Sequence, residues 1–223
     1  MPKQCASLIA IILASTTLNG QTTTLSVETV VSNLQNRYDR LADFTADFHH
    51  TYAGGLLSTT DTERGVVYVK KPGRWRFDYS MPEKKSFICN GTSIHSYFPE
   101  DQQVIISQLP ANTTASTPAL FLSGVGNLRR DFTAEMSEPL DSDSSSLQLR
   151  LTPVVNTADY EFLILTLDIQ SYNIEVMATT DFQGGVSTYT FVNLQENPGL
   201  ADRLFEFDVP QDVAVITDDS FTR

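Results

Sequence analysis

The feature that most constrains the fold of this chain is a long succession of short strand-like runs. Apolar and polar residues alternate with a period of two from Phe44 to Phe48, and turn residues such as Lys71-Pro72-Gly73 and Asn90-Gly91 separate the runs that follow. Further strands are expected at 65–69, 75–79, 86–89, 93–98, 104–108, 132–136, 147–152, 161–169, 174–180, 186–192 and 204–207. Short connections between so many strands predict a mainly β (α+β) fold, with an antiparallel meander as its sheet or barrel.

Two segments depart from this pattern and have helical spacing. From Ser26 to Asp43 the apolar residues recur every three or four positions, Ser26 suits the N-cap, and the acidic Glu28 suits the first turn. Residues 117–124 combine a threonine N-cap, Pro118 at the first helical position and a closing glycine. The middle of this second helix is apolar on nearly all sides, so we expect other elements to cover it.

The start of the chain has the features of a secretory signal. Lys3 precedes the apolar run Ala6–Ala14, and a small, polar stretch follows it. We therefore expect residues 1–20 to be a signal peptide and residues 21–223 to form a single domain in the periplasm. The alternative is an N-terminal buried strand or helix. No other apolar run approaches the length of a membrane span, so a soluble, monomeric mature protein is expected.

The charge of the chain excludes some partners. Its 27 acidic residues outnumber its 15 basic residues, for a net charge of −12, and nucleic acid phosphates would repel it. We therefore expect no nucleic-acid partner. Seven basic residues nevertheless gather between Arg64 and Lys85. They are either a solvated hairpin face or a docking patch for an acidic partner or an anionic membrane surface.

Residues suited to catalysis or metal binding are few. Cys5 lies in the expected signal, so Cys89 is left without a disulfide partner, and its apolar surroundings indicate a small buried residue rather than a nucleophile paired with His95. His49 and His50 point to opposite faces of a strand and cannot readily chelate one metal ion. Motifs for zinc, phosphate binding or a serine hydrolase are missing from the sequence. We expect no enzyme, no cofactor and no metal.

A hairpin motif and a series of shorter motifs follow one another in a specific order. The hairpin Gly65–Tyr79 has an apolar strand, two basic residues, a proline, a two-residue turn and an aromatic-x-aromatic pair. The shorter motifs are Ile88–Thr92, His95–Pro99, the strand start at Gln103, Pro118–Gly124, Leu149–Pro153, Thr190–Asn193 and Phe205–Pro210. Their order and spacing over residues 25–219 resemble the LolA family of periplasmic carriers of outer-membrane lipoproteins.

This resemblance implies an unclosed, strongly bent antiparallel half-barrel of about 10–11 strands, with a helical lid over an apolar cavity. The lid would include the helices at 27–43 and 118–123. The candidate cavity and lid residues are Leu34, Phe48, Trp75, Phe77, Tyr79, Tyr97, Leu120, Phe121 and Leu122. From the residues alone, a core filled by side chains remains the alternative, and ordinary core packing remains an alternative for the two aromatics of the hairpin.

The resemblance also implies a latch for the lid. In the family the second basic residue of the hairpin donates hydrogen bonds to backbone carbonyls of the lid and holds it closed when the carrier is empty. That residue is Lys71 here, where an arginine is often found, and lysine lacks the rigid guanidinium fork. Arg74 or Lys70 are alternative latches. His95 stands where the family often has an aromatic residue.

The function implied is that of a carrier without enzymatic activity. It would bind the acyl chains of lipoproteins that an inner-membrane ABC-type complex releases, and would deliver them to an outer-membrane acceptor. The chain has no lipobox cysteine after its apolar start, so we do not expect it to be membrane-anchored. Two alternatives are a related lipid or glycolipid transporter or envelope-stress sensor domain of the same fold, and an exported hydrolase.

Overall fold

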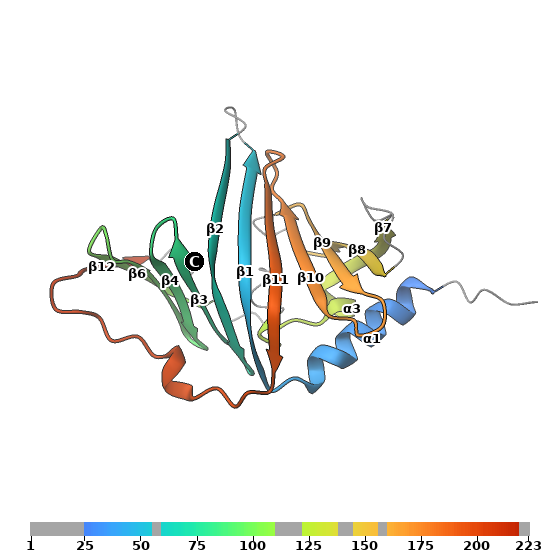
Figure 1. Cartoon of the computed structure of the whole chain (residues 1–223), viewed down its shortest axis with the longest axis horizontal. Coiled ribbons are helices and arrows are strands. Elements are labelled where there is room, and N and C mark those ends of the chain that lie inside the picture. Colours follow the sequence, from blue (N-terminus) through green and yellow to red (C-terminus); the bar gives the residue numbers. More distant parts are fainter. Residues whose placement is uncertain (1–24, 55–58, 110–121, 138–144, 156–159, 219–223) are drawn as a thin grey trace, which may run out of the picture.

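In the part of the chain that the computed structural model describes, twelve strands form one sheet (Figure 1). The structure describes residues 25–54, 59–109, 122–137, 145–155 and 160–218. The strands are β1 (Asp43–Gly54), β2 (Thr59–Lys70), β3 (Arg74–Met81), β4 (Lys85–Asn90), β5 (Ser93–Phe98), β6 (Gln103–Gln108), β7 (Phe132–Ser137), β8 (Ser146–Pro153), β9 (Phe162–Asp168), β10 (Ile174–Thr180), β11 (Val186–Glu196) and β12 (Ala214–Asp218). Their order across the sheet is β12-β6-β5-β4-β3-β2-β1-β11-β10-β9-β8-β7.

The sheet is open. Strands β7 and β12 stand at its two edges, and in the described part of the chain they do not pair with each other. The expected mainly β, unclosed half-barrel is therefore confirmed. Consecutive strands pair antiparallel within β1–β6 and within β7–β11, as the expected meander requires, and β1 and β11 join these two series antiparallel. Only β12 departs from the antiparallel arrangement among the described strands, because it runs parallel to β6. This pair brings the end of the chain back to the outer edge of the sheet.

Three helical elements accompany the sheet within the described residues. They are α1 (Val27–Arg40), α3 (Leu128–Asp131) and the 3-10 turn η1 (Asp202–Phe205). The Ser26 hydroxyl accepts a hydrogen bond of 3.3 Å from the Thr29 amide, so the expected N-cap of α1 is confirmed. Helix α1 ends at Arg40, earlier than the expected Asp43, because Asp43 already begins β1.

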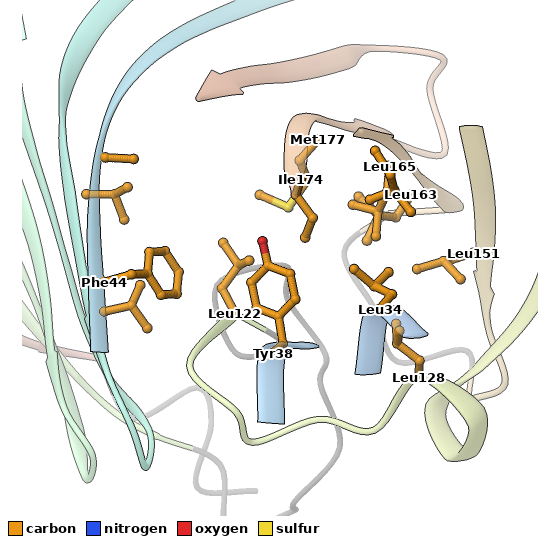
Figure 2. Packing of buried hydrophobic residues seen from close by; sticks show 14 of the residues in the cluster. Leu34, Tyr38, Phe44, Leu122, Leu128, Leu151, Leu163, Leu165, Ile174 and Met177 are labelled. Carbon is orange, nitrogen blue, oxygen red and sulfur yellow. The ribbon is translucent and has the colours of Figure 1, made fainter. Parts of the chain in front are cut away.

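The predicted alternation divides the sheet into two faces. On β1, Phe44 and Phe48 are buried on the inner face, while His49 points to the opposite, outer face and is exposed. Neighbouring strands continue this division, since directly paired residues share a face. Helix α1 and Leu122 lie on the inner face, and the apolar core lies between them and the strands (Figure 2).

The segment after β11 crosses the outer face of the sheet. The turn η1 lies against β3 and β4, and Arg76 donates a hydrogen bond of 3.1 Å to the Leu204 carbonyl. Asp202 accepts from Lys70 at 2.6 Å and from Arg74 at 2.7 Å. These contacts fasten the end of the chain to the back of the hairpin β2–β3.

One expectation for the C-terminal segment was wrong. We expected a strand at 204–207, but η1 occupies 202–205, and the strand that does form is β12. The alternating Phe205 and Phe207 suggested a strand. Their side chains instead cover the outer face, where Phe205 is 1% exposed and the ring centroid of Phe207 lies 5.0 Å from that of Tyr97.

We predict that Phe205→Ala destabilises the protein by about 3–5 kcal/mol, because it leaves a cavity under the C-terminal segment. Phe182, 62% exposed in the turn between β10 and β11, is the matched control. Phe182→Ala should change the free energy of unfolding by no more than about 0.5 kcal/mol. Urea unfolding of both variants measures the difference. Equal, small effects would show that the segment does not stabilise the sheet.

Candidate functional site: an apolar interior with a fastened lid

Helix α1 covers one half of the inner face. Its buried side chains include Leu34 and Tyr38, which point toward Phe44 on one side and toward Leu163 and Leu165 of β9 on the other (Figure 2). Leu122 and Leu128 join this layer from the segment before β7 (Figure 2). The helix therefore packs inside the curve of the sheet and closes this half over a continuous apolar surface.

Aromatic side chains form the other half of the inner face, and we call them the aromatic wall: Phe48, Trp75, Phe77, Tyr79 and Tyr189. Phe48 lies 4.8 Å from Tyr79 and 5.6 Å from Phe77, measured between ring centroids. Trp75 continues the wall at 5.9 Å from Phe77. Its indole N–H is buried and has no hydrogen-bond partner among the described residues. An unpaired buried donor beside an apolar wall suits a ligand that brings a carbonyl acceptor.

Gly65 makes room for the centre of this wall. It stands directly opposite Phe48 in the β1–β2 pair. A Cβ at this position would lie 2.6 Å from the Phe48 ring and 2.1 Å from the Asp78 carbonyl oxygen. Only glycine allows the Phe48 ring to cross the strand at this point. The packing of the Phe48 ring therefore explains why the hairpin motif Gly65–Tyr79 begins with a glycine.

The structure does not bring every sequence-predicted residue to this interior. Leu34, Phe48, Trp75, Phe77, Tyr79 and Leu122 are all buried in the inner cluster. Tyr97 lies on the outer face, where it contacts Phe207 and pairs with Ser86. Leu120 and Phe121 lie outside the described residues, as does most of the expected helix at 118–123.

A small apolar gap remains between the lid and the sheet. It is lined by Tyr38, Phe44, Ala46, Leu122, Ile174, Phe191 and Leu194, and it has about 240 Å³ of unfilled space including its mouth. A methylene group is about as large as a water molecule, whose share of volume is roughly 30 Å³, so a sixteen-carbon chain needs on the order of 450 Å³. This gap is therefore too small for such a chain, and it has to widen to admit one.

The turn between β2 and β3 fastens the lid to the sheet. The Lys71 ammonium donates a hydrogen bond to the Tyr38 carbonyl in the last turn of α1. The Gly73 amide donates to the Ser123 carbonyl at 3.0 Å, and the Lys71 amide donates to the Ala42 carbonyl at 2.9 Å. A cation suits the negative end of the helix dipole at this position. One turn therefore holds both α1 and the segment that carries Leu122.

The aliphatic stem of Lys71 runs close to the backbone of the lid. A Cβ at Gly124 would lie 2.8 Å from Lys71 Cδ, and Gly124 has a φ of +77°. Glycine is favoured there for both reasons. Burial lowers the pKa of the half-buried Lys71, and the nearby Asp39 carboxylate opposes this shift.

Comparison with known proteins shows the family to which this chain belongs. The sequence model described as "Outer membrane lipoprotein carrier protein LolA" matches residues 39–208. The chain belongs to the LolA family. Two curated relatives are named outer-membrane lipoprotein carrier protein. The one from Methylococcus capsulatus is 26% identical over 84% of this chain and 87% of its own, and that from Pseudomonas aeruginosa is 28% identical over 83% and 86%.

A solved structure supports the fold. An uncharacterized conserved protein from Thermus thermophilus aligns with a TM-score of 0.54 and covers 86% of this chain and 98% of its own. At 10% identity this likeness concerns the fold alone. Within the described ranges of this LolA-family chain, no helix is long and apolar enough to cross a membrane, and no group of His, Cys, Asp and Glu could hold a metal ion.

Most of the basic cluster found in the sequence serves internal contacts. Besides Lys71, the side chains of Lys70 and Arg74 bind Asp202, Arg76 binds Asp78, and Lys85 binds Glu63. Lys70 and Arg74 therefore hold the C-terminal segment on the outer face and do not reach α1. This placement favours Lys71 as the latch among the three candidates of the LolA-type hairpin. Because these basic side chains are paired internally, fewer positive charges remain for the docking patch that the sequence left open.

We predict that Lys71→Leu weakens the closed lid by about 1–3 kcal/mol, because the Tyr38 carbonyl loses its charged donor. Trp75 is the single tryptophan of the chain and belongs to the same buried cluster as Leu122. Its fluorescence emission should shift to longer wavelength in the variant as water reaches the interior. Lys84→Leu, at an exposed position in the next turn, is the control and should leave the emission unchanged. Identical spectra for all three proteins would contradict the latch.

Proposed function

We propose that this chain is a periplasmic carrier for the acyl chains of lipoproteins. The observation that carries the proposal is an apolar interior covered by a lid, with the Lys71 ammonium bound to a carbonyl at the end of the lid helix. Membership of the LolA family and the names of the curated relatives support it. On this proposal, residues 1–20 direct export and residues 21–223 form the carrier domain.

The energetics suit a carrier that both holds and releases its cargo. Burial of each methylene group contributes about 0.8 kcal/mol, so a sixteen-carbon chain gains roughly 10 kcal/mol or more before costs. Opening the lid breaks the contacts of Lys71 and Gly73 and exposes the apolar face of α1. Release restores them. The closed lid therefore opposes loading and favours delivery.

This balance defines the two partners that the carrier needs. An inner-membrane ABC-type complex would supply the work that opens the lid and transfers the acyl chains. An outer-membrane acceptor would receive them, with lid closure contributing to the release. The carrier's own part in both steps is binding, and it needs no cofactor for that.

Mass spectrometry tests the proposed cargo directly. We expect protein purified from its native periplasm to carry acylated polypeptides in a complex of one to one, visible under native conditions. Non-acylated forms of the same polypeptides should not be retained, because they offer no chain to bury. Bound glycolipid or free lipid without lipoprotein would instead favour a related lipid transporter. A purely unliganded protein would contradict the carrier function.

We also predict that the latch acts on delivery more than on loading. Lys71→Leu should accept lipoprotein from inner membranes but deliver less of it to acceptor membranes, because the empty variant no longer gains the lid contacts. Lys71→Arg should deliver at least as well as the unaltered protein, since its guanidinium donates to more than one carbonyl. A transfer assay with loaded carrier measures the delivered fraction. Complete delivery by Lys71→Leu would place the latch elsewhere.

A further inference from the structure

A group of polar side chains lies on the inner face at the opposite end of β1 from the latch. We call it the rim cluster: His50, Glu63, Lys85 and Ser187. His50 Nδ1 lies 2.9 Å from Glu63 Oε2, and His50 Nε2 lies 2.8 Å from Ser187 Oγ. Lys85 Nζ donates to Glu63 Oε1 at 2.5 Å. Four different strands, β1, β2, β4 and β11, contribute one residue each.

The rim cluster is continuous with the aromatic wall. His50 follows Phe48 on the same face of β1, and its ring stacks on Tyr189 with centroids 4.2 Å apart and planes at 5°. The Lys85 ammonium lies 4.6 Å from the Tyr79 ring centroid. The two tyrosine hydroxyls lie 2.9 Å apart. An acyl chain along the wall would therefore bring its polar end to this group.

The charges of the rim cluster cancel at neutral pH. Burial lowers the pKa of His50 despite its hydrogen bond with Glu63, so the imidazole is neutral. Burial alone would raise the pKa of Glu63, but hydrogen bonds from Lys85 and His50 outweigh it and lower the pKa. One ammonium then balances one carboxylate. Burial also raises the pKa values of Tyr79 and Tyr189, so both hydroxyls keep their protons.

Donors remain for a ligand after these internal contacts. Of two hydroxyls that share one hydrogen bond, only one donates to the other, so a second O–H remains at the Tyr79–Tyr189 pair. The Lys85 ammonium has three N–H groups, and one of them serves Glu63. These donors suit carbonyl oxygens. A phosphate, by contrast, would lose its hydration here without meeting a net positive charge.

We propose that the rim cluster binds the uncharged, ester- and amide-bearing end of an acylated polypeptide and discriminates against phospholipids with the same acyl chains. The inference rests on the proposed carrier function and assigns it a specificity site. It explains why Glu63 lies where it neutralises the lysine beside an apolar wall. A carrier that moves between two membranes would otherwise fill with the phospholipids that surround its cargo.

Chemistry at Ser187 is the competing explanation. The order Ser187–His50–Glu63 is that of a serine hydrolase triad. Ser187, however, lies inside β11 and pairs with Tyr52 of β1 and Thr179 of β10, so the strand ladders on both sides engage the backbone around it. Among the described residues this leaves no pair of free amides beside Ser187 to stabilise an oxyanion. The network therefore fits binding better than ester cleavage.

The decisive variant is Glu63→Gln, which keeps the size of the side chain and frees the charge of Lys85. The full mature protein would be titrated with a triacylated peptide and with phosphatidylglycerol of matched chains, each displacing a hydrophobic dye. We expect the unaltered protein to prefer the peptide by on the order of tenfold or more, and the variant to lose most of this preference through tighter phosphatidylglycerol binding. Peptide affinity should change by no more than about twofold.

Two controls make the result interpretable. Glu100→Gln makes the same charge change at an exposed turn and should keep the preference of the unaltered protein. Lys85→Met should widen the preference, because the cluster then has a net negative charge, and it serves as the second test if Glu63→Gln does not fold. An unchanged preference in the folded rim variants would overturn the proposal, as would release of free fatty acid from the peptide. Failure of the unaltered protein to bind either probe would instead contradict the carrier function.

Discussion

An open sheet with one apolar face has to be covered, and the rest of this structure depends on how that cover is held. Helix α1 buries its apolar side against the β7–β10 half of the sheet, which removes apolar side chains of both from water. The cover reaches the opposite half of the sheet through the β2–β3 turn, where Lys71 meets the end of α1 and Gly73 meets Ser123. These contacts add to those that Asn33 and Arg37 of α1 make on the other side, with Tyr172 and with Asn173 and Glu196.

The lid is held by two kinds of contact, apolar packing and polar contacts, and they respond differently when the interior opens. Apolar packing is strong in total but has no single essential partner, while the contacts at the turn are few and specific. Cargo that replaces the apolar contacts of α1 with acyl chains compensates most of the lost burial. The polar contacts have no such replacement, so on the proposed function their loss would oppose loading and their return would favour delivery. On the proposed function, the Lys71 ammonium at the turn and the small gap therefore both belong to the closed, empty state of the carrier.

Local patterns in the sequence predicted much of the fold. The spacing in α1, the alternation in β1 and the turn residues around β3 depend on neighbours in the chain, so they were visible from residues alone. The edge strand β12 could not be predicted from local patterns, because it pairs in parallel with β6 across about a hundred intervening positions. The alternation of Phe205 and Phe207 predicted a strand wrongly. A loop that packs two side chains on the outer face shows the same alternation as a strand.

The candidate site was predicted less completely. The aromatic wall follows from alternation on β3, and Lys71 was found only through the resemblance of its hairpin to the LolA family. Tyr97 follows the same alternation, but its side chain lies on the outer face. A strand pattern alone does not tell which face of the sheet the lid covers and which face the C-terminal segment covers. The rim cluster joins His50 and Ser187, 137 positions apart, and no local signal connects them.

The central claim is that acyl chains lie between α1 and the inner face of the sheet. A triacylated peptide whose chains carry a photoreactive diazirine would test it most directly, with the linked residues mapped by mass spectrometry. The account predicts links to the inner face, at Phe48, Phe77 and Leu122, and their loss when unlabelled cargo competes. Links gathered on the outer face around Tyr97 and Phe207, or spread evenly over the surface, would contradict it.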